Sequence, residues 1–422
     1  MRRKNKTKIR EENLLYKVEQ TILPVNNSVY FLIQNRKDHS IPFTATNYLT
    51  EYTTKDNSPN TIRNIAFALA YLYSFATQIK LDLNRLIYEG ATLTLQQIEQ
   101  LRQFILTGGN PKISLFNNQS IQSRMVLTNS QMDLIKGYLI AGLIEYGNGG
   151  DLEQKIKNIT SKFKRLRFKE ERNERIRVLD LTTKKLLEEA FKDQFNPVWK
   201  DELISLRNSC IYGIADETGA RIGEILGLYV NDLSTGALPT IYIVRRKNNQ
   251  NDPRRNKPQA KTFSRPIPIS RELHQKIISY IKRRPNTNIR RNKHSLHLFV
   301  SHRTKTIGKP LSIRQAHKLM EDVNRYYSQE PLWKEKANWH DVRHTALYRF
   351  YWAYEGEPNQ KELLQQIGGH MSDTVFARYH QLAIAEKAQK IHRQILDSAE
   401  NSSTIQKTGP SLNWENESTL ED

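Results

Sequence analysis

Apolar residues recur at three- and four-residue spacing through much of residues 43–146, and this periodicity constrains the fold more than any other feature. One such stripe follows Ser58-Pro59 and consists of Ile62, Ile65, Leu69, Leu72, Tyr73 and Ala76. This spacing places the residues on one side of a helix, and a serine before a proline is a favourable helix start. Residues 132–146 show a similar pattern. Because each amphipathic helix needs a partner, the region predicts a compact helical bundle.

Strand-forming runs are short and few. Residues 240–244 are rich in β-branched and aromatic side chains, which predicts a strand. Residues 263–269 return after a long polar loop, and their two prolines favour an edge position. Residues 18–23 and 29–33 flank a turn-forming cluster and predict a small hairpin. The expected fold class is therefore mainly α with a small antiparallel sheet.

A chain of 422 residues is too long for one ordinary hydrophobic core, so two or three domains are expected. Composition predicts a basic N-terminal arm with the small hairpin, a helical domain, a basic linker, a second domain and an acidic tail that we expect to be disordered. The corresponding ranges are 1–42, 43–165, 166–177, 178–398 and 399–422. A last amphipathic helix is predicted over residues 382–396.

The chain is strongly basic, with a net charge of +21. Such a charge favours binding to a polyanion, of which DNA and RNA are the commonest, although a basic protein can also simply stay soluble. Basic residues cluster near the linker at Lys162, Lys164, Arg165 and Arg167. This cluster fits either a solvated linker or a strap that binds a phosphate backbone.

Other compartments and site types are disfavoured by the sequence. The single cysteine, Cys210, allows no internal disulfide, and no zinc-ligand spacing occurs. The N-terminus lacks the apolar run of a signal peptide, and no stretch approaches the length of a membrane span. We therefore expect a soluble cytoplasmic protein that does not associate with membranes.

The string from Thr218 to Leu228, Thr-Gly-Ala-Arg-Ile-Gly-Glu-Ile-Leu-Gly-Leu, contains Arg221 and Glu224. Their spacing is common for ion pairs on helix surfaces. The flanking aliphatic residues indicate a packed segment, however, and a packed arginine needs an anionic partner. Glu224 would then hold the guanidinium of Arg221 in place, while the remaining N–H groups of the guanidinium face a phosphate.

A second string, His340-Asp341-Val342-Arg343-His344, places two histidines and an arginine on one helix face. The two histidines have the spacing of a metal-binding pair. The glutamate of a His-Glu-x-x-His site is absent, and the fixed positive charge of Arg343 would repel a metal ion. A phosphate explains an arginine between two imidazoles better, because both side-chain types donate hydrogen bonds to an oxyanion.

The third string is Gly369-His370, with Tyr379 nine residues further on. A glycine pair at 368 and 369 lets the backbone come close to a ligand. The histidine also fits an ordinary turn, and the tyrosine fits an amphipathic core position. As a nucleophile, a phenol with a pKa near ~10 needs neighbours that favour the phenolate or take its proton.

Together these strings resemble those of the tyrosine recombinase (phage integrase) family. The matching strings are Thr218-Gly-Ala-Arg221-Ile-Gly-Glu224, His340-Asp-Val-Arg343-His344, Gly369-His370 and Tyr379-His380, in that order. The resemblance covers residues 178–398 well, whereas residues 43–165 are similar to the core DNA-binding domain of the family only in general pattern. Gly368 stands where the family often has an apolar residue.

The resemblance implies a catalytic set. Arg221 and Arg343 would clamp the scissile phosphate, His340 and His370 would complete the pocket and shuttle protons, and Tyr379 would attack to form a 3′-phosphotyrosyl link. Because that link retains the energy of the broken strand, neither ATP, a metal nor another cofactor is implied.

The family also has a lysine on the sheet hairpin that protonates the leaving 5′-hydroxyl. Lys261 fits this role because it precedes the returning strand, while Lys247 and Lys257 are alternatives. Glu224 and His344 are expected to support the site structurally.

The implied function is site-specific DNA recombination or integration for a mobile element, phage or replicon. The implied architecture is a C-shaped clamp of two domains around double-stranded DNA. The implied assembly is a homo-tetramer on two DNA sites within the nucleoid, with exchange of the C-terminal helix between protomers and with accessory DNA-bending proteins. The alternatives are a type IB topoisomerase-like or telomere-resolving strand transferase, and a DNA-binding regulator that kept the fold without the chemistry.

Overall fold

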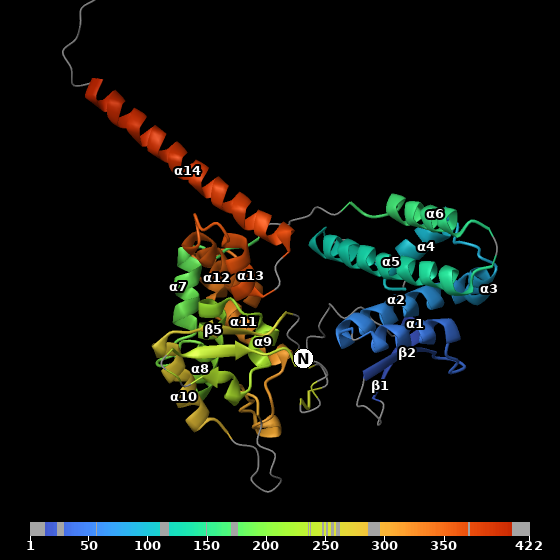
Figure 1. Ribbon diagram of the computed structural model, residues 1–422, viewed down its shortest axis with the longest axis horizontal. Helices are drawn as coiled ribbons and strands as arrows, with labels where there is room; N and C mark the ends of the chain where they lie inside the picture. The colour runs from blue at the N-terminus through green and yellow to red at the C-terminus, as the bar shows by residue number, and fades with distance from the viewer. Residues whose placement is uncertain are drawn as a thin grey trace, which may run out of the picture. The chain divides into compact units, whose positions relative to one another are not determined.

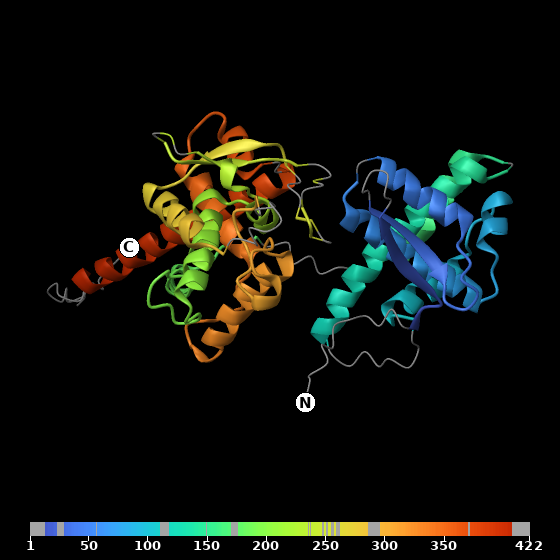
Figure 2. The same ribbon diagram turned by 90° about the horizontal axis from the view of Figure 1, so that it is seen from below.

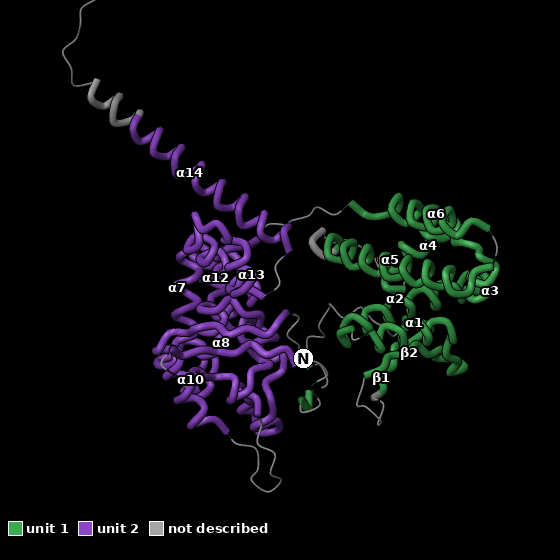
Figure 3. Tube along the Cα trace, viewed as in Figure 1, with its two compact units in different colours: residues 1–174, 248–257 green, residues 175–247, 258–422 purple. Residues whose placement is uncertain are grey.

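The chain divides into two compact units, each described here by itself (Figure 3). Unit 1 comprises residues 1–174 and 248–257, and unit 2 comprises residues 175–247 and 258–422. The structure is a computed structural model, and the residues that it describes are 13–22, 29–55, 57–109, 118–148, 150–169, 176–234, 236, 238–246, 249, 252–254, 257–258, 262–285, 296–369 and 372–406. Each unit has its own hydrophobic core.

Unit 1 combines one antiparallel hairpin with a set of helices (Figure 1). The hairpin consists of β1 (Tyr16–Ile22) and β2 (Val29–Asn35). The helices in its described part are α1 (Phe43–Thr54), α2 (Pro59–Gln78), α3 (Leu83–Tyr88), α4 (Leu95–Leu106), α5 (Asn118–Tyr146) and α6 (Leu152–Arg165). Helix α2 starts as its sequence predicts, because the Ser58 hydroxyl accepts from the backbone N–H of Thr61 at 3.2 Å.

The hairpin belongs to the core of unit 1. Phe31 and Ile33 alternate with more exposed residues along β2, and Ile33 has no exposed surface. Both strands pack against α2, and β2 also packs against α1. The sequence assigned this hairpin to a separate arm. The difference has a physical reason: one apolar face of a two-stranded sheet must be covered to be stable in water.

Unit 2 is built mainly from helices, with a three-stranded antiparallel sheet in the order β3-β4-β5. The strands are β3 (Leu233–Ser234), β4 (Thr240–Ile243) and β5 (Arg265–Pro268). The helices in its described part are α7 (Leu181–Ala190), α8 (Glu202–Thr218), α9 (Ile222–Leu226), α10 (Arg271–Arg283), α11 (Ile313–Tyr326), α12 (Trp339–Ala353), α13 (Gln360–Gly368) and α14 (Asp373–Gln406). The protein is thus mainly helical with small antiparallel sheets, and β5 lies at the sheet edge as its prolines predict.

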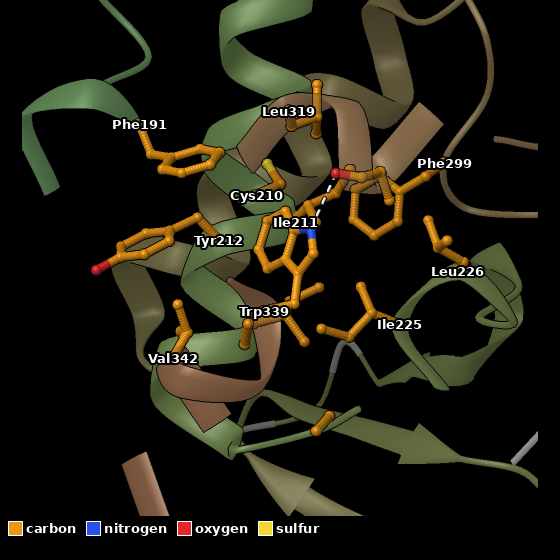
Figure 4. Packing of buried hydrophobic residues seen from close by; sticks show 14 of the residues in the cluster. Phe191, Cys210, Ile211, Tyr212, Ile225, Leu226, Phe299, Leu319, Trp339 and Val342 are labelled. Atoms are coloured by element: carbon orange, nitrogen blue, oxygen red, sulfur yellow. Dashed lines mark hydrogen bonds between the residues drawn. The ribbon is translucent and has the colours of Figure 1, made fainter. Parts of the chain in front are cut away.

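Helix α8 lies at the centre of unit 2 and packs against α10 and α12. Its buried residues meet aromatic side chains from several elements, and the rings of Phe191 and Tyr212 stack with their centroids 4.8 Å apart (Figure 4). Trp339 is buried in the same cluster, and its indole N–H donates to the carbonyl of Ala316 at 2.8 Å. Because Trp339 is the first residue of α12, this packing fixes the start of the helix that carries His340 and Arg343.

Helix α14 is longer than the sequence predicted. It begins at Asp373 rather than near residue 382, and it continues to Gln406, into the range assigned to a tail (Figure 2). The start has an identifiable cause: the Ser372 hydroxyl accepts from the N–H of Val375 at 3.4 Å, and an acidic first turn suits a helix N-terminus. Tyr379 therefore lies on a helix. None of the helices in the described ranges combines the length and apolar character that a bilayer span requires.

Candidate active site

Arg221 lies at the junction between α8 and α9. Gly219 ends α8 in the left-handed region, with φ of 62°, and Arg221 is the residue that precedes the first turn of α9. The Arg221 side chain is about one-third exposed, with Nη1 3.3 Å from Oε1 of Glu224. The backbone N–H of Arg221 also donates to Oε2 of Glu224 at 3.0 Å. Glu224 therefore holds both the backbone and the guanidinium of this arginine.

Arg343 is buried and joins two chain segments that are distant in sequence. Nη1 donates to the carbonyl of Gly219, and Nη2 donates to the carbonyl of Gly368 at 2.8 Å. Burial, followed by the charge of Arg221, lowers the pKa of Arg343 to about 10. The guanidinium thus remains charged at neutral pH. This one side chain links the end of α8, which leads to Arg221, to the end of α13, which leads to residue 370.

A second buried arginine, Arg265, supports this arrangement. Its Nη2 lies 3.0 Å from Oε2 of Glu224, and its Nε donates to the carbonyl of Ile367 at 2.7 Å. The Thr262 hydroxyl donates to Oε1 of Glu224 at 2.7 Å. Burial alone would raise the pKa of Glu224, but the charge of Arg265 and these hydrogen bonds outweigh it and lower the pKa. These contacts therefore connect three segments: the residues that lead into β5, the start of α9 and the end of α13.

Arg265 is a site residue that was not predicted from the sequence, although its position in the strand carries a signal. Side chains alternate between the two faces of a strand. Arg265 is in phase with Ile267, and both are buried, whereas Pro266 and Pro268 are exposed. An arginine at an inward position of a strand needs a buried anion, and Glu224 is that anion.

Tyr379 is fully buried, and its hydroxyl lies 2.7 Å from Nδ1 of His344. The His344 ring in turn contacts the His340 ring, with centroids 4.1 Å apart and planes at 76°. Burial raises the pKa of Tyr379 above its usual range, although the charges of Arg343 and Arg221 oppose this. Burial, followed by the charges of His340 and Arg343, lowers the pKa of His344 to about 3. At neutral pH both members of this pair are uncharged.

His340 stands one helical turn before His344 and is more exposed. Desolvation, followed by the charges of Arg343 and Arg221, lowers its pKa below the ordinary value. Arg221, His340, Arg343 and Tyr379 thus influence one another electrostatically within unit 2. These residues come from three helix regions that are far apart in sequence.

The turn between α13 and α14 requires a glycine. Gly369 has φ of 73° and ψ of −159°, a conformation that side chains strongly disfavour. A Cβ atom there would also lie 2.7 Å from Cβ of Thr262 and 2.9 Å from Nη1 of Arg265. His370 itself lies outside the described residues. The backbone that leads to it is fixed against the same residues that hold Glu224.

The hairpin lysines are only partly covered by the structure. Lys261 and Lys247 lie outside the described residues. Lys257 is described, and its Nζ donates to the carbonyl of Asn249 at 2.9 Å. Thr262 directly follows Lys261 and contacts Glu224. The described neighbour of Lys261 is therefore part of the site.

The basic cluster before the linker divides into two kinds of residue. Lys162 donates from Nζ to the Thr92 hydroxyl and to the Leu93 carbonyl, both at 3.1 Å, and so holds the start of α4. Arg167 pairs with Asp133 at 2.6 Å. Lys164 and Arg165 are exposed. DNA binding by this cluster stays a prediction, and it falls chiefly on Lys164 and Arg165.

Metal ligands are not grouped in the part of the chain that the structure describes: no three His, Cys, Asp or Glu side chains there could hold an ion together. His340 and His344 face each other beside Arg343, whose charge opposes a cation.

The site in unit 2 thus combines two guanidinium groups, two imidazoles and a phenol, which belong to Arg221, Arg343, His340, His344 and Tyr379. Residues 184–386 match the family model described as the phage integrase family. This region of the chain is therefore identified with the phage integrase family, the tyrosine recombinases, and it lies in unit 2 apart from residues 248–257. No curated protein sequence matches the chain.

Solved structures that match the chain include recombinases and integrases. The Tn1549 transposon integrase in complex with circular intermediate DNA is 18% identical over 75% of this chain and 97% of that chain, with a TM-score of 0.45. The XerH recombinase bound to difH substrate is 15% identical over 82% of this chain and 84% of that chain, also with a TM-score of 0.45. A lambda integrase dimer bound to a COC′ core site is 12% identical over 80% of this chain and 93% of that chain, with a TM-score of 0.44.

Proposed function

We propose that this chain cleaves and rejoins double-stranded DNA as a site-specific recombinase of a mobile element, phage or replicon. The observation that carries the proposal is the buried Tyr379 hydroxyl, 2.7 Å from Nδ1 of His344 and within the field of Arg221 and Arg343. A phenol used only for packing does not need two arginines near it, whereas a phenol that attacks a phosphodiester does.

In the proposed reaction, the phenol oxygen of Tyr379 attacks the scissile phosphorus and forms a 3′-phosphotyrosyl ester. The bond from phosphorus to the 5′-oxygen breaks, and Lys261 gives that oxygen its proton. Attack by a 5′-hydroxyl on the ester reverses these steps and rejoins the strand. Since one phosphate ester replaces another, neither ATP nor another cofactor is required.

Arg221 and Arg343 neutralise the charge on the phosphoryl oxygens in this scheme, with His340 and His370 completing the pocket. Arginine stabilisation of a phosphoryl transition state contributes roughly 10³ to 10⁵ in rate. Arg343 suits this role because backbone carbonyls at Gly219 and Gly368 orient its guanidinium before DNA binds.

Both units would contact DNA in this proposal, unit 1 as a core DNA-binding domain and unit 2 at the cleavage site, together enclosing the duplex as a clamp. The net charge of +21 supports a polyanionic partner. Binding should then weaken steeply as salt rises, because counterions are released from the phosphates that the protein contacts.

An exposed apolar stripe on α14 supports the assembly of four protomers on two DNA sites. Ile384, Ile391 and Ile395 are 53%, 56% and 59% exposed and recur at helical spacing, so they form an apolar stripe on this helix. We propose a second copy of the chain as the occupant, since recombination requires several protomers on DNA. A chain that ends after residue 386 should still bind one site but lose synapsis of two sites in a native-gel assay.

The proposal is tested by covalent trapping on nicked suicide substrates made from DNA around the locus that encodes the chain. Tyr379→Phe should abolish the covalent adduct and leave DNA binding intact. Tyr351→Phe is the matched control: Tyr351 also bonds a histidine, Nδ1 of His380, at 2.7 Å. Tyr351→Phe should form the adduct normally. A chelator should change neither result, and an undiminished adduct in Tyr379→Phe would refute the proposed nucleophile.

A further inference from the structure

The Tyr379 hydroxyl has a specific partner that the proposed catalytic scheme leaves without a chemical role. Nδ1 of His344 lies 2.7 Å from the phenol oxygen, within the range of a strong hydrogen bond. The pair is formed between α12 and α14, and the tyrosine has no exposed surface. When the protonated phenol donates to Nδ1, His344 is the tautomer that carries its hydrogen on Nε2.

We propose that His344 is the proton acceptor for Tyr379 in DNA cleavage and that the bound scissile phosphate makes it basic enough to act. This inference rests on the proposed function and departs from the expectation that His344 only supports the site and that His340 and His370 carry the protons. The distinction follows from geometry: the His344 ring contacts the phenol, while the His340 ring stacks edge-on against His344.

In the site without DNA, proton transfer from Tyr379 to His344 is disfavoured. Burial and then the charges of His340, Arg343, Arg378 and Arg221 lower the pKa of His344 to about 3, while burial raises that of the phenol. A proton transfer between them is therefore unfavourable in the free protein. An anionic phosphodiester bound between Arg221 and Arg343 offsets the cationic charges, which raises the basicity of His344. The nucleophile is then activated only when its substrate is in place.

As the bond from the phenol oxygen to phosphorus forms, the phenol proton moves to Nδ1 of His344 and leaves an imidazolium. The bond from phosphorus to the 5′-oxygen breaks with its electron pair, and that oxygen takes a proton from Lys261. In rejoining, His344 returns its proton to the tyrosine oxygen as the phosphotyrosyl bond breaks.

The test compares single-turnover adduct formation by the full chain and by His344→Gln, each with tyrosine or with difluorotyrosine at position 379. Fluorine lowers the phenol pKa, so it reduces the need for a proton acceptor without changing the fold. His380→Gln is the matched control, because His380 also bonds a tyrosine hydroxyl through Nδ1 at 2.7 Å, that of Tyr351. DNA affinity and thermal melting establish that each variant is folded.

We expect His344→Gln to slow adduct formation by roughly 10² to 10⁴, difluorotyrosine to recover about tenfold or more of that loss, and His380→Gln to react normally. Two results would overturn the inference: an unchanged rate in His344→Gln, or a slow rate that difluorotyrosine does not improve, which marks a purely structural residue. Absence of any adduct with the unmodified chain would instead contradict the proposed function.

Discussion

Arg265 and Glu224 form an ion pair in which neither side chain is exposed, with Nη2 of the arginine 3.0 Å from Oε2 of the carboxylate. They come from β5 and α9, two elements of unit 2 that carry or adjoin proposed catalytic residues. Because Arg265 also bonds the Ile367 carbonyl, the pair fixes three segments with respect to one another.

Breaking this pair should destabilise the chain. Arg265→Met removes the buried cation that pairs with the Glu224 carboxylate and leaves only the partly exposed Arg221, so the free energy of unfolding in urea should fall by about 3–5 kcal/mol. Arg265→Met combined with Glu224→Leu should recover much of that stability but not DNA cleavage, because Arg221 loses its support. Arg85→Met, which breaks an exposed pair with Glu89, should cost far less, because water screens that pair. Equal losses at Arg265 and Arg85 would contradict the account.

The turn before position 370 should tolerate no side chain. Gly369→Ala combines backbone strain of about 1–3 kcal/mol with a clash against Thr262. Gly356→Ala is the control for strain alone, since Gly356 has φ of 88° and open space around it. Thermal melting should show a larger loss at 369, and cleavage should fall only there. Matching losses of stability and activity in both variants would show that the close contact has no role.

The pH dependence of stability should report the neutral state of His344. Its pKa in the folded chain is about 3, below the ordinary 6.5, so the unfolded chain takes up a proton first as pH falls. This contribution to stability is therefore lost progressively as pH falls from about 6.5 towards 3, with a slope of at most about 1.4 kcal/mol per pH unit. His344→Phe lacks it, so its stability relative to the parent chain should improve over that window. Parallel curves from denaturant unfolding would contradict the prediction.

Arg343 should contribute to reaction rate far more than to DNA affinity. Arg343→Lys keeps a positive charge, but one ammonium group cannot reproduce the planar fork that bonds the carbonyls of Gly219 and Gly368. Single-turnover cleavage should fall by roughly 10³ to 10⁵, with a small change in binding. Arg349→Lys, at an exposed arginine on the same helix that pairs with Asp216, should leave both quantities unchanged. Equal losses of rate and affinity at Arg343 would make it a binding residue only.

Local features of the fold were predictable from the sequence because they depend on neighbours in the chain. Apolar periodicity predicted helices such as α2 and the second half of α5, and the proline-containing strand was correctly expected at a sheet edge. The fold class and the family were confirmed. The start of α14 could not be predicted from the apolar stripe, which begins only after residue 382; the earlier signal is Ser372, a helix-capping residue type.

Relations between distant residues were harder to predict. The strings gave Arg221, His340 and Arg343 as candidates, but no spacing shows that Arg343 bonds the carbonyls on either side of the site. The contact between His344 and Tyr379 likewise depends on how α12 packs against α14. Arg265 was missed because a charged residue in a strand is ordinarily read as exposed, and only its alternation with Ile267 reveals otherwise.

The central claim is that the phenol of Tyr379 becomes covalently joined to DNA. The most direct measurement is proteolysis of the trapped adduct on a suicide substrate, followed by mass spectrometry of the peptide that carries the nucleotide. The account predicts a 3′-phosphate ester on Tyr379. A nucleotide attached to any other residue, or the absence of a covalent adduct on DNA that the chain binds specifically, would contradict it.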